Sequence, residues 1–269
     1  MPLFSKYRGA GNDFVLIREE ELGLHDAVAL AQRICSRETG VGADGLITVS
    51  FRHAGLVRIR FFNPDGSEFS TCGNGSRCAA QYTVDQGLTS AEHTLKTDDG
   101  EILARVSTGS VSLDYSINVR VEQELLTTLQ NKPHNAWLVS MGTPHLVIPV
   151  ESVDIENFEE LCEPLRGLAE LGEQGANVDL VAREGASISV RTFERGVEGE
   201  TLACGSGCMA AAFVLRQGIL TQNRVEIMTR SGETLGVEFL EGGQIRLIGP
   251  ATFLFNGALF NRRFALIKL

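Results

Sequence analysis

Apolar residues in the first part of the chain form short runs that predict strands. Residues 14–17 and 46–51 are rich in β-branched and apolar side chains. Residues 58–62 alternate between apolar and basic side chains and lead into Asn63-Pro-Asp-Gly66, a typical turn sequence. The pattern therefore predicts several strands separated by tight turns.

Other segments have the spacing of helices. Residues 26–37 carry apolar side chains three to four positions apart and come before Gly40, which predicts a helix with a glycine stop. Residues 78–84 predict a helix that stops at Gly87. Residues 208–215 are apolar nearly all round, as in a helix buried within a domain.

The remaining segments predict antiparallel strands and one crossover. Residues 101–117 and 224–248 alternate in character and are broken by glycines, which is typical of a β-meander. Residues 252–269 are strand-like, and we expect them to return to the first half. Residues 121–134 have the weakest pattern, so we expect the crossover between halves there.

The sequence repeats itself at a long period. Gly11-Asn-Asp-Phe-Val-Leu-Ile17 matches Gly142-Thr-Pro-His-Leu-Val-Ile148 at an offset of 142 − 11 = 131. Cys72-Gly-Asn-Gly-Ser matches Cys204-Gly-Ser-Gly-Cys at 204 − 72 = 132. Further matches in the same order include Gln86-Gly-Leu88 with Gln217-Gly-Ile219. A period this long predicts a duplicated domain rather than a solenoid.

The repeated motif suits acid–base chemistry. A cysteine at a helix N-terminus faces unpaired amides and the helix dipole, which we expect to lower the pKa of the thiol. The glycines after Cys72 and Cys204 let backbone N–H groups approach an anion such as a carboxylate. Two such thiols could remove a proton from one face of a carbon and return one to the other.

Composition narrows the class of protein. The 269 residues are 43% hydrophobic and 22% charged, as in globular proteins, and allow two domains. A net charge of −10 argues against nucleic acid or an anionic membrane as partner. No export signal or apolar membrane-spanning stretch is evident, so we expect a cytoplasmic protein whose six cysteines are reduced.

Other readings of these residues remain open. Cys35, Cys78, Cys162 and Cys208 fit packing roles, and the cysteine spacings do not match zinc knuckles, so we expect no metal. The segment 40–45 spells a dinucleotide fingerprint, but a helix precedes it and a strand follows, the reverse of the required order. No lysine suggests a Schiff base. We therefore expect no cofactor.

The chain resembles the diaminopimelate epimerase family over most of its length. The resemblance depends on ordered motifs: Gly9-Ala-Gly-Asn-Asp-Phe14, Gly40-Val-Gly-Ala-Asp-Gly45, Phe62-Asn-Pro-Asp-Gly-Ser-Glu68, Cys72-Gly-Asn-Gly-Ser-Arg-Cys78, Ser140-Met-Gly-Thr-Pro-His145, Glu194-Arg-Gly196 and Gly199-Glu-Thr-Leu-Ala-Cys-Gly-Ser-Gly207. It implies an α/β (α+β) fold of two pseudo-symmetric halves, each a sheet wrapped around a central helix. The expected halves are residues 1–117 with 252–269, and residues 118–251, with the site in the cleft between them.

The resemblance also implies an activity. It predicts cofactor-independent interconversion of LL- and meso-2,6-diaminopimelate, for lysine and peptidoglycan synthesis. The expected partner is this small-molecule substrate, and a homodimer is the one protein assembly left open. Carried over by position, the thiols of Cys72 and Cys204 act as acid and base, assisted by His145 and Glu194. The residues implied in substrate binding are Asn12, Asn63, Gly73, Asn74, Thr143, Asn177, Glu194, Arg195, Gly205 and Ser206.

Two departures from the family pattern bear on specificity. Thr143 stands where the family usually has asparagine, and a hydroxyl cannot replace both the donor and the acceptor of an amide. The second repeat also has one extra residue in the segment 194–200. We therefore hypothesise that the protein recognises the distal carboxylate and amine of the substrate less stringently than its relatives do. The alternatives are a proline racemase-like or phenazine-type isomerase, or a non-catalytic amino-acid-binding or thiol-redox protein.

Overall fold

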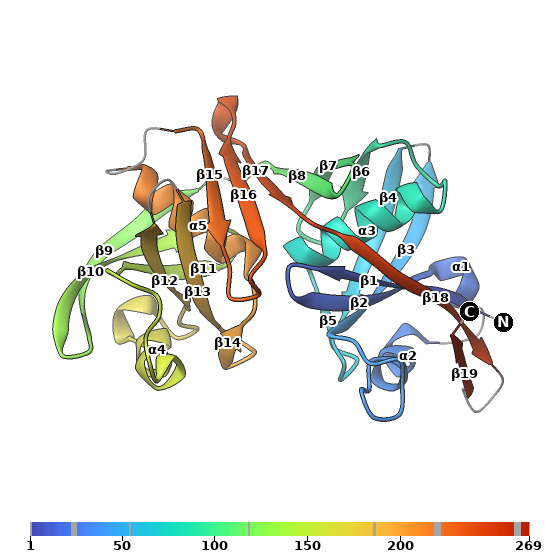
Figure 1. Cartoon of the computed structure of the whole chain (residues 1–269), viewed down its shortest axis with the longest axis horizontal. Coiled ribbons are helices and arrows are strands. Elements are labelled where there is room, and N and C mark those ends of the chain that lie inside the picture. The colour runs from blue at the N-terminus through green and yellow to red at the C-terminus, as the bar shows by residue number, and fades with distance from the viewer. Residues whose placement is uncertain are drawn as a thin grey trace. The chain divides into compact units, whose positions relative to one another are not determined.

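The computed structural model describes residues 2–22, 26–53, 55–117, 119–184, 187–217, 222–260 and 265–268. The chain forms two compact units, and the first is discontinuous in sequence. Unit 1 comprises Met1–Tyr115 and Gly249–Leu269, and unit 2 comprises Ser116–Ile248. Unit 1 therefore begins and ends the chain (Figure 1).

Each unit combines a many-stranded sheet with a few helices. The elements of unit 1 are β1 (Leu3–Gly9), β2 (Asn12–Arg18), α1 (Glu19–Leu22), α2 (Ala27–Ile34), β3 (Gly45–His53), β4 (Leu56–Phe62), β5 (Glu68–Phe69), α3 (Gly73–Asp85), β6 (Glu92–Lys96), β7 (Glu101–Ser107), β8 (Ser110–Tyr115), β18 (Thr252–Phe260) and β19 (Ala265–Lys268). Those of unit 2 are β9 (Arg120–Leu129), β10 (Lys132–Ser140), β11 (Pro144–Pro149), α4 (Phe158–Arg166), the 3₁₀ helix η1 (Ala169–Leu171), β12 (Asn177–Glu184), β13 (Ser187–Glu194), β14 (Gly199–Thr201), α5 (Gly205–Arg216), β15 (Arg224–Met228), β16 (Thr234–Phe239), the 3₁₀ helix η2 (Glu241–Gly243) and β17 (Ile245–Gly249).

The two units share one strand topology. In unit 1 the pairing runs β1-β2-β3-β4-β6-β7-β8, with the pairs β2–β3 and β4–β6 parallel. In unit 2 it runs β10-β11-β12-β13-β15-β16-β17, with β11–β12 and β13–β15 parallel. The prediction of an α+β fold built from two similar halves is therefore confirmed.

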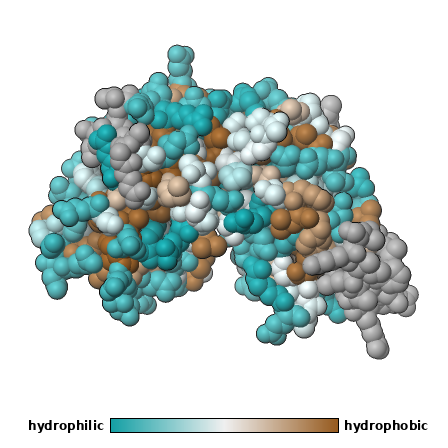
Figure 2. Space-filling model, in the orientation of Figure 1, coloured by the Kyte–Doolittle hydropathy of each residue, from teal (hydrophilic) through white to brown (hydrophobic). Residues whose placement is uncertain are grey.

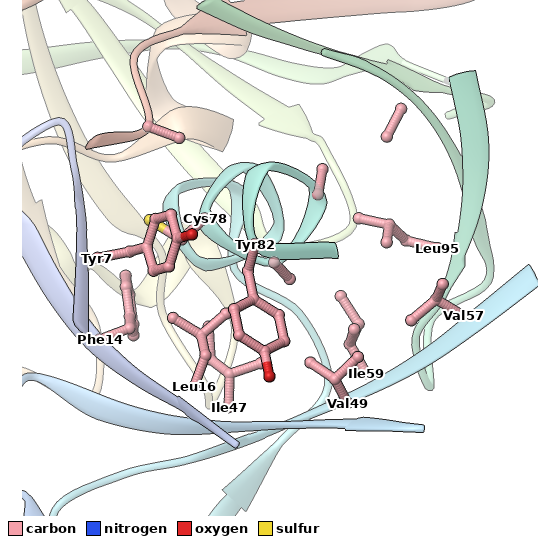
Figure 3. Close-up of a cluster of buried hydrophobic side chains, with 14 of the residues drawn as sticks. Tyr7, Phe14, Leu16, Ile47, Val49, Val57, Ile59, Cys78, Tyr82 and Leu95 are labelled. Carbon is pink, nitrogen blue, oxygen red and sulfur yellow. The ribbon is translucent and has the colours of Figure 1, made fainter. Parts of the chain in front are cut away.

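Side chains alternate between the two faces of each sheet, as the pleat requires. On β2, Phe14 and Leu16 belong to the core around α3, whereas Val15 and Ile17 belong to the core that contains α2. Figure 3 shows the first of these cores, with the sheet residues pointing toward α3. In unit 2 the core that contains α4 likewise takes Leu146 and Ile148. Each sheet thus has a central helix on one face, α3 or α5, and outer helices on the other.

Most of the predicted elements are present. The helix predicted at residues 26–37 is α2, which is shorter because Cys35 already forms its C-cap. The helices predicted at 78–84 and 208–215 lie within α3 and α5. Residues 252–260 form β18, which pairs with β1 as expected of a returning strand. Of the repeat residues, Gly218 and Ile219 lie outside the described part of the chain.

The expected crossover at residues 121–134 is wrong. Strands β9 and β10 form a long antiparallel hairpin there, joined at Gln130 and Asn131, which both have positive φ. The hairpin lacks a clear sequence pattern because one of its faces is exposed even where it is apolar: Leu126 is 74% exposed. Two central turn residues with positive φ are typical of the tight turns that join such strands.

Much of the surface is hydrophilic, in keeping with the share of charged residues in the sequence. Hydrophilic residues cover much of the face drawn in Figure 2, with apolar residues between them. Within the described ranges, no helix has the length and apolar character needed to cross a membrane.

Candidate active site

The two repeated cysteines are both helix N-caps. Cys72 precedes α3, and its Sγ accepts a hydrogen bond from the backbone N–H of Gly75 at 3.4 Å. Cys204 precedes α5, and its Sγ accepts from the N–H of Gly207, also at 3.4 Å. Both cap residues have extended backbones, so each sulfur folds back over the first turn of its helix. The sequence motif therefore produces the same local geometry twice.

The second glycine of each motif is required by close packing. A Cβ on Gly75 would lie 2.8 Å from a ring carbon of Phe61 on β4. A Cβ on Gly207 would lie 2.3 Å from Oδ1 of Asp179 on β12. Each thiol helix thus rests with its first turn directly on the sheet, and a side chain at either position would force it away.

In unit 1, the Asn74 side chain that follows Cys72 is held by two neighbours. Its Nδ2 donates to Oδ1 of Asn12 at 2.7 Å, and its Oδ1 accepts from Nη2 of the fully buried Arg77 at 2.6 Å. Asn12 in turn donates from Nδ2 to Oδ2 of Asp44 at 3.0 Å. The structure therefore brings Asn12, Gly73 and Asn74 together at the Cys72 end of α3.

An ion-pair network holds Asp44, the carboxylate that accepts the hydrogen bond from Asn12. Arg37 donates to the carboxylates of both Asp13 and Asp44, at 2.9 and 2.6 Å. The buried Lys6 lies 2.7 Å from the other oxygen of Asp13. Burial alone would raise the pKa of Asp13, but hydrogen bonds from Arg37 and Lys6 outweigh it and lower the pKa to about 2. This carboxylate thus stays ionised.

Asn63, at the end of β4, is bound within its own turn. Its Nδ2 donates to Oγ of Ser67 at 2.9 Å, and its N–H donates to the carbonyl oxygen of Ser67 at 2.8 Å. The described contacts of Asn63 therefore fit the turn role that its sequence context also allowed.

In unit 2, four of the predicted residues form one connected group around His145. Its Nε2 lies 3.1 Å from Oγ1 of Thr143 and 3.3 Å from Nδ2 of Asn177. The Oδ1 of Asn177 accepts from the backbone N–H of Arg195 at 2.8 Å. His145 is completely buried, and β11, β12 and the end of β13 position the group. The structure therefore brings Thr143, His145, Asn177 and Arg195 together.

The second thiol lies among acidic groups. Glu194 ends β13, and burial raises the pKa of its carboxyl. Cys204 is buried, and its Sγ lies 3.4 Å from Oγ of Ser206. Burial first, and then the charges of Glu194 and Asp179, raise the pKa of the Cys204 thiol well above its usual value.

The prediction of a lowered thiol pKa is therefore wrong for Cys204. The hydrogen bonds from Ser206 and from the N–H of Gly207 do lower the pKa, but they are weaker than burial and the two carboxyl groups. At neutral pH this sulfur is a thiol, which is a proton donor. Within the part of the chain that the structure describes, none of the six cysteines forms a disulfide. Among the described residues, no group of three or more His, Cys, Asp or Glu could hold a metal ion.

Several residues of these clusters were not predicted from the sequence. They are Lys6, Asp13, Arg37, Asp44 and Arg77 in unit 1, and Asp179 and Thr192 in unit 2. Asp179 accepts from Nδ1 of His145 and from Oγ1 of Thr192, both at 2.7 Å. The repeat itself carried a signal for Thr192, because it places this residue opposite Phe61 of the first copy. The strand pairing places Asp179 opposite Ile47.

The fold is shared with several solved racemases, epimerases and phenazine-biosynthesis proteins. A protein of the phenazine biosynthesis PhzF family from Enterococcus faecalis superposes with a TM-score of 0.74 at 16% identity, covering 97% of this chain and 99% of that one. A hydroxyproline epimerase from Agrobacterium vitis superposes with a TM-score of 0.69 at 13% identity, covering 100% and 92%. The chain, with an N-capping thiol in each unit, therefore has the fold seen in these epimerases, racemases and phenazine-biosynthesis proteins.

Sequence comparison identifies the family. The family model described as diaminopimelate epimerase matches residues 4–114 and 137–254. The chain is 34% identical to the diaminopimelate epimerase of Methanocella arvoryzae, over 95% of this chain and 96% of that one. It is 37% identical to that of Caldanaerobacter subterraneus subsp. tengcongensis, over 95% and 98%. The chain belongs to the diaminopimelate epimerase family.

Proposed function

We propose that this protein epimerises LL-2,6-diaminopimelate to meso-diaminopimelate by a two-thiol mechanism. The observation that carries the proposal is the repeated geometry of Cys72 and Cys204, each an N-cap whose sulfur accepts an amide hydrogen bond. Inversion at a carbon needs one group to remove a proton from one face and another to deliver a proton to the opposite face. Two equivalent thiols supply both roles without a cofactor.

The charge around Cys204 assigns the roles in one direction. A two-thiol mechanism starts with one sulfur protonated and the other not. Burial and the neighbouring carboxyl groups keep Cys204 protonated, so it is the proton donor. Cys72 is then the acceptor of the α-proton. For the reverse reaction the protonation states exchange.

The backbone around each thiol can stabilise the reacting carboxylate. As the α-proton leaves, negative charge develops on the substrate carboxylate, and N–H groups at a helix N-terminus stabilise such charge. Gly73 and Asn74 begin α3, and Gly205 and Ser206 begin α5. We assign these amides to the reacting end of diaminopimelate. The product serves lysine and peptidoglycan synthesis.

Deuterium exchange tests this function. In D₂O, the wild-type protein is expected to incorporate deuterium at Cα of LL-diaminopimelate while the meso isomer forms. The loss of the Cα proton signal is measured by ¹H NMR. Cys72→Ser and Cys204→Ser should each reduce epimerisation by about 10³-fold or more, because a hydroxyl is a far weaker acid than a thiol. Cys35→Ser, at a buried cysteine of the α2 core, is the matched control.

Two outcomes would count against the proposal. Unchanged epimerisation in either single variant would rule out paired thiols. Turnover of a disulfide substrate by the wild type, without deuterium uptake from diaminopimelate, would instead indicate a thiol-redox protein.

A relaxed specificity is the finer part of the proposal. The hydroxyl of Thr143 lies 3.1 Å from Nε2 of His145, so this side chain is already engaged within the protein. If Thr143 contacts the distal amine and carboxylate of diaminopimelate only weakly, the site depends less on these groups. Shorter acidic amino acids should then react slowly. Glutamate and aspartate are assayed beside diaminopimelate, with Thr143→Asn as the matched variant that should restore stringency. No detectable turnover of either amino acid would end this part of the proposal.

A further inference from the structure

The face of the unit 2 sheet under α5 carries buried polar residues where unit 1 has only hydrocarbon. In unit 1 the residues beneath α3 include Phe14, Ile47 and Phe61, which belong to one hydrophobic core. Figure 3 labels Phe14 and Ile47 in this core. The strand pairing of unit 2 places three other residues at the equivalent positions: His145 (145 − 14 = 131), Asp179 (179 − 47 = 132) and Thr192 (192 − 61 = 131).

The structure confirms that the two sets occupy the same places. Ile47 pairs with Phe61 between β3 and β4, and Asp179 pairs with Thr192 between β12 and β13. A Cβ on Gly75 would contact Phe61 and Ile47, and one on Gly207 would contact Asp179 and Thr192. In each unit, therefore, the same two sheet positions support the first turn of the thiol helix.

The polar set is buried as deeply as the apolar one. His145 and Asp179 are 0% exposed and Thr192 is 3% exposed. Buried ionic groups rarely stabilise a protein more than well-packed hydrophobic residues of similar volume. Because unit 1 shows that the scaffold accepts hydrocarbon here, the fold does not require the polar residues of unit 2.

The contacts of this set fix which nitrogen of His145 carries its proton. Both oxygens of Asp179 are used: Oδ2 lies 2.7 Å from Nδ1 of His145, and Oδ1 accepts from Oγ1 of Thr192 at 2.7 Å. An ionised carboxylate can only accept, so the proton lies on Nδ1. The bond to the N–H of Arg195 turns Oδ1 of Asn177 away and leaves its Nδ2 toward Nε2 of His145, 3.3 Å distant. Nε2 is therefore an acceptor.

We propose that Asp179 and Thr192 are positioning residues that hold His145 in the Nδ1–H tautomer, with Nε2 as its hydrogen-bond acceptor beside Thr143. This inference rests on the proposed function and on the thiol-assisting role that the family resemblance implies for His145. Thr192 fixes the rotation of the Asp179 carboxylate, and Asp179 fixes the ring. In unit 1 the equivalent positions carry Phe14, Ile47 and Phe61, so that unit has no such polar set there.

The test separates a positioning role from a structural one. Asp179→Asn keeps the shape of the side chain but removes its charge, and should lower kcat about 10- to 100-fold with little change in KM, as expected for a group that orients another. Thr192→Val should give a smaller fall in kcat. Ile47→Val, at the equivalent position of unit 1, is the matched control and should leave kcat unchanged.

The tautomer is read directly by NMR of protein labelled with ¹⁵N-histidine, assigned with His145→Phe. In the wild type, neutral His145 should show an unprotonated Nε2, and Asp179→Asn should shift this toward a mixture of tautomers. A wild-type Nε2–H tautomer, or unchanged kcat in Asp179→Asn, would overturn the proposal. If the wild type did not exchange deuterium, the proposed function would fail while the tautomer result remained readable.

A third variant shows whether the polar set serves the fold. His145→Phe/Asp179→Leu/Thr192→Val makes the face beneath α5 apolar, like that beneath α3. We expect its denaturation midpoint to equal or exceed that of the wild type, with no measurable epimerisation. A large loss of stability in this variant, with normal kcat in Asp179→Asn, would make the set structural.

Discussion

The two thiol helices have the same backbone geometry but opposite surroundings. Helix α3 rests on hydrocarbon at its first turn and contains a buried cation, Arg77, in its second. Helix α5 rests on the buried carboxylate of Asp179 and has the apolar Met209 where the repeat places Arg77. Duplication therefore preserved the position of each sulfur while the charges around it diverged. In a two-thiol reaction, such divergence gives one sulfur the resting proton.

The largest expected effect on stability comes from replacing Arg77 with methionine, the residue at the equivalent position, Met209, in α5. Arg77→Met would leave Oδ1 of Asn74 and the carbonyl of Pro250 without their present donor. A buried acceptor that loses its partner costs about 1–3 kcal/mol, so we expect a loss of roughly 3 kcal/mol in unfolding free energy. Urea denaturation measures it. Met209→Leu, the matched change in α5, should cost less than about 1.5 kcal/mol, and equal losses would contradict the contrast.

The two packed glycines sharpen the comparison. Gly207→Ala would place a methyl group against Oδ1 of Asp179, whose carboxylate is held by one hydrogen bond at each oxygen. Gly75→Ala would place it against the edge of the Phe61 ring. Overpacking costs about 1–3 kcal/mol, and we expect Gly207→Ala near the upper end and Gly75→Ala near the lower end. Denaturation midpoints of both variants decide the order. The reverse order would show that the Asp179 carboxylate moves aside at a lower cost in free energy than the Phe61 ring.

The smallest expected effect concerns the pKa of Cys204. The charge of Glu194 helps to raise this pKa, so Glu194→Gln should lower it wherever Glu194 is ionised in the wild type. A lower pKa means more thiolate at a given pH, so we expect faster alkylation of Cys204 in this variant. Iodoacetamide labelling of the Cys204 peptide, followed by mass spectrometry from pH 6 to 10, measures the rate.

Glu198→Gln, in the exposed turn after Glu194, is the control for this experiment. Its carboxylate is exposed and pairs with Arg166, whereas the charge of Glu194 acts on Cys204. Equal acceleration in both variants would show that general surface charge, rather than Glu194, sets the reactivity.

The sequence predicted the parts of the molecule that depend on local pattern. Glycines after Cys72 and Cys204 fixed both helix starts, and the repeat predicted the shared topology. The pKa of Cys204 could not be predicted in this way, because burial and then the charges of Glu194 and Asp179, all set by tertiary structure, raise it. The hairpin of β9 and β10 was missed because exposed strands such as the one that carries Leu126 have no clean alternation.

Asp179 and Thr192 teach a more general point about repeats. A single copy gives no reason to single out either residue, since acidic and hydroxyl side chains are common on strands. Only alignment with Ile47 and Phe61 shows that polar groups occupy positions suited to hydrocarbon. In a duplicated protein, the departures from internal symmetry are therefore as informative as the matches.

The discontinuity of unit 1 has a consequence for how the chain is made. Unit 2 is complete in sequence once residue 248 has been synthesised, whereas unit 1 still lacks β18, the antiparallel partner of β1. Domains generally fold as units while the chain grows from its N-terminus. Here unit 1 emerges first from the ribosome but cannot complete its sheet until β18 has been synthesised. Unit 2 can therefore finish folding before unit 1 does.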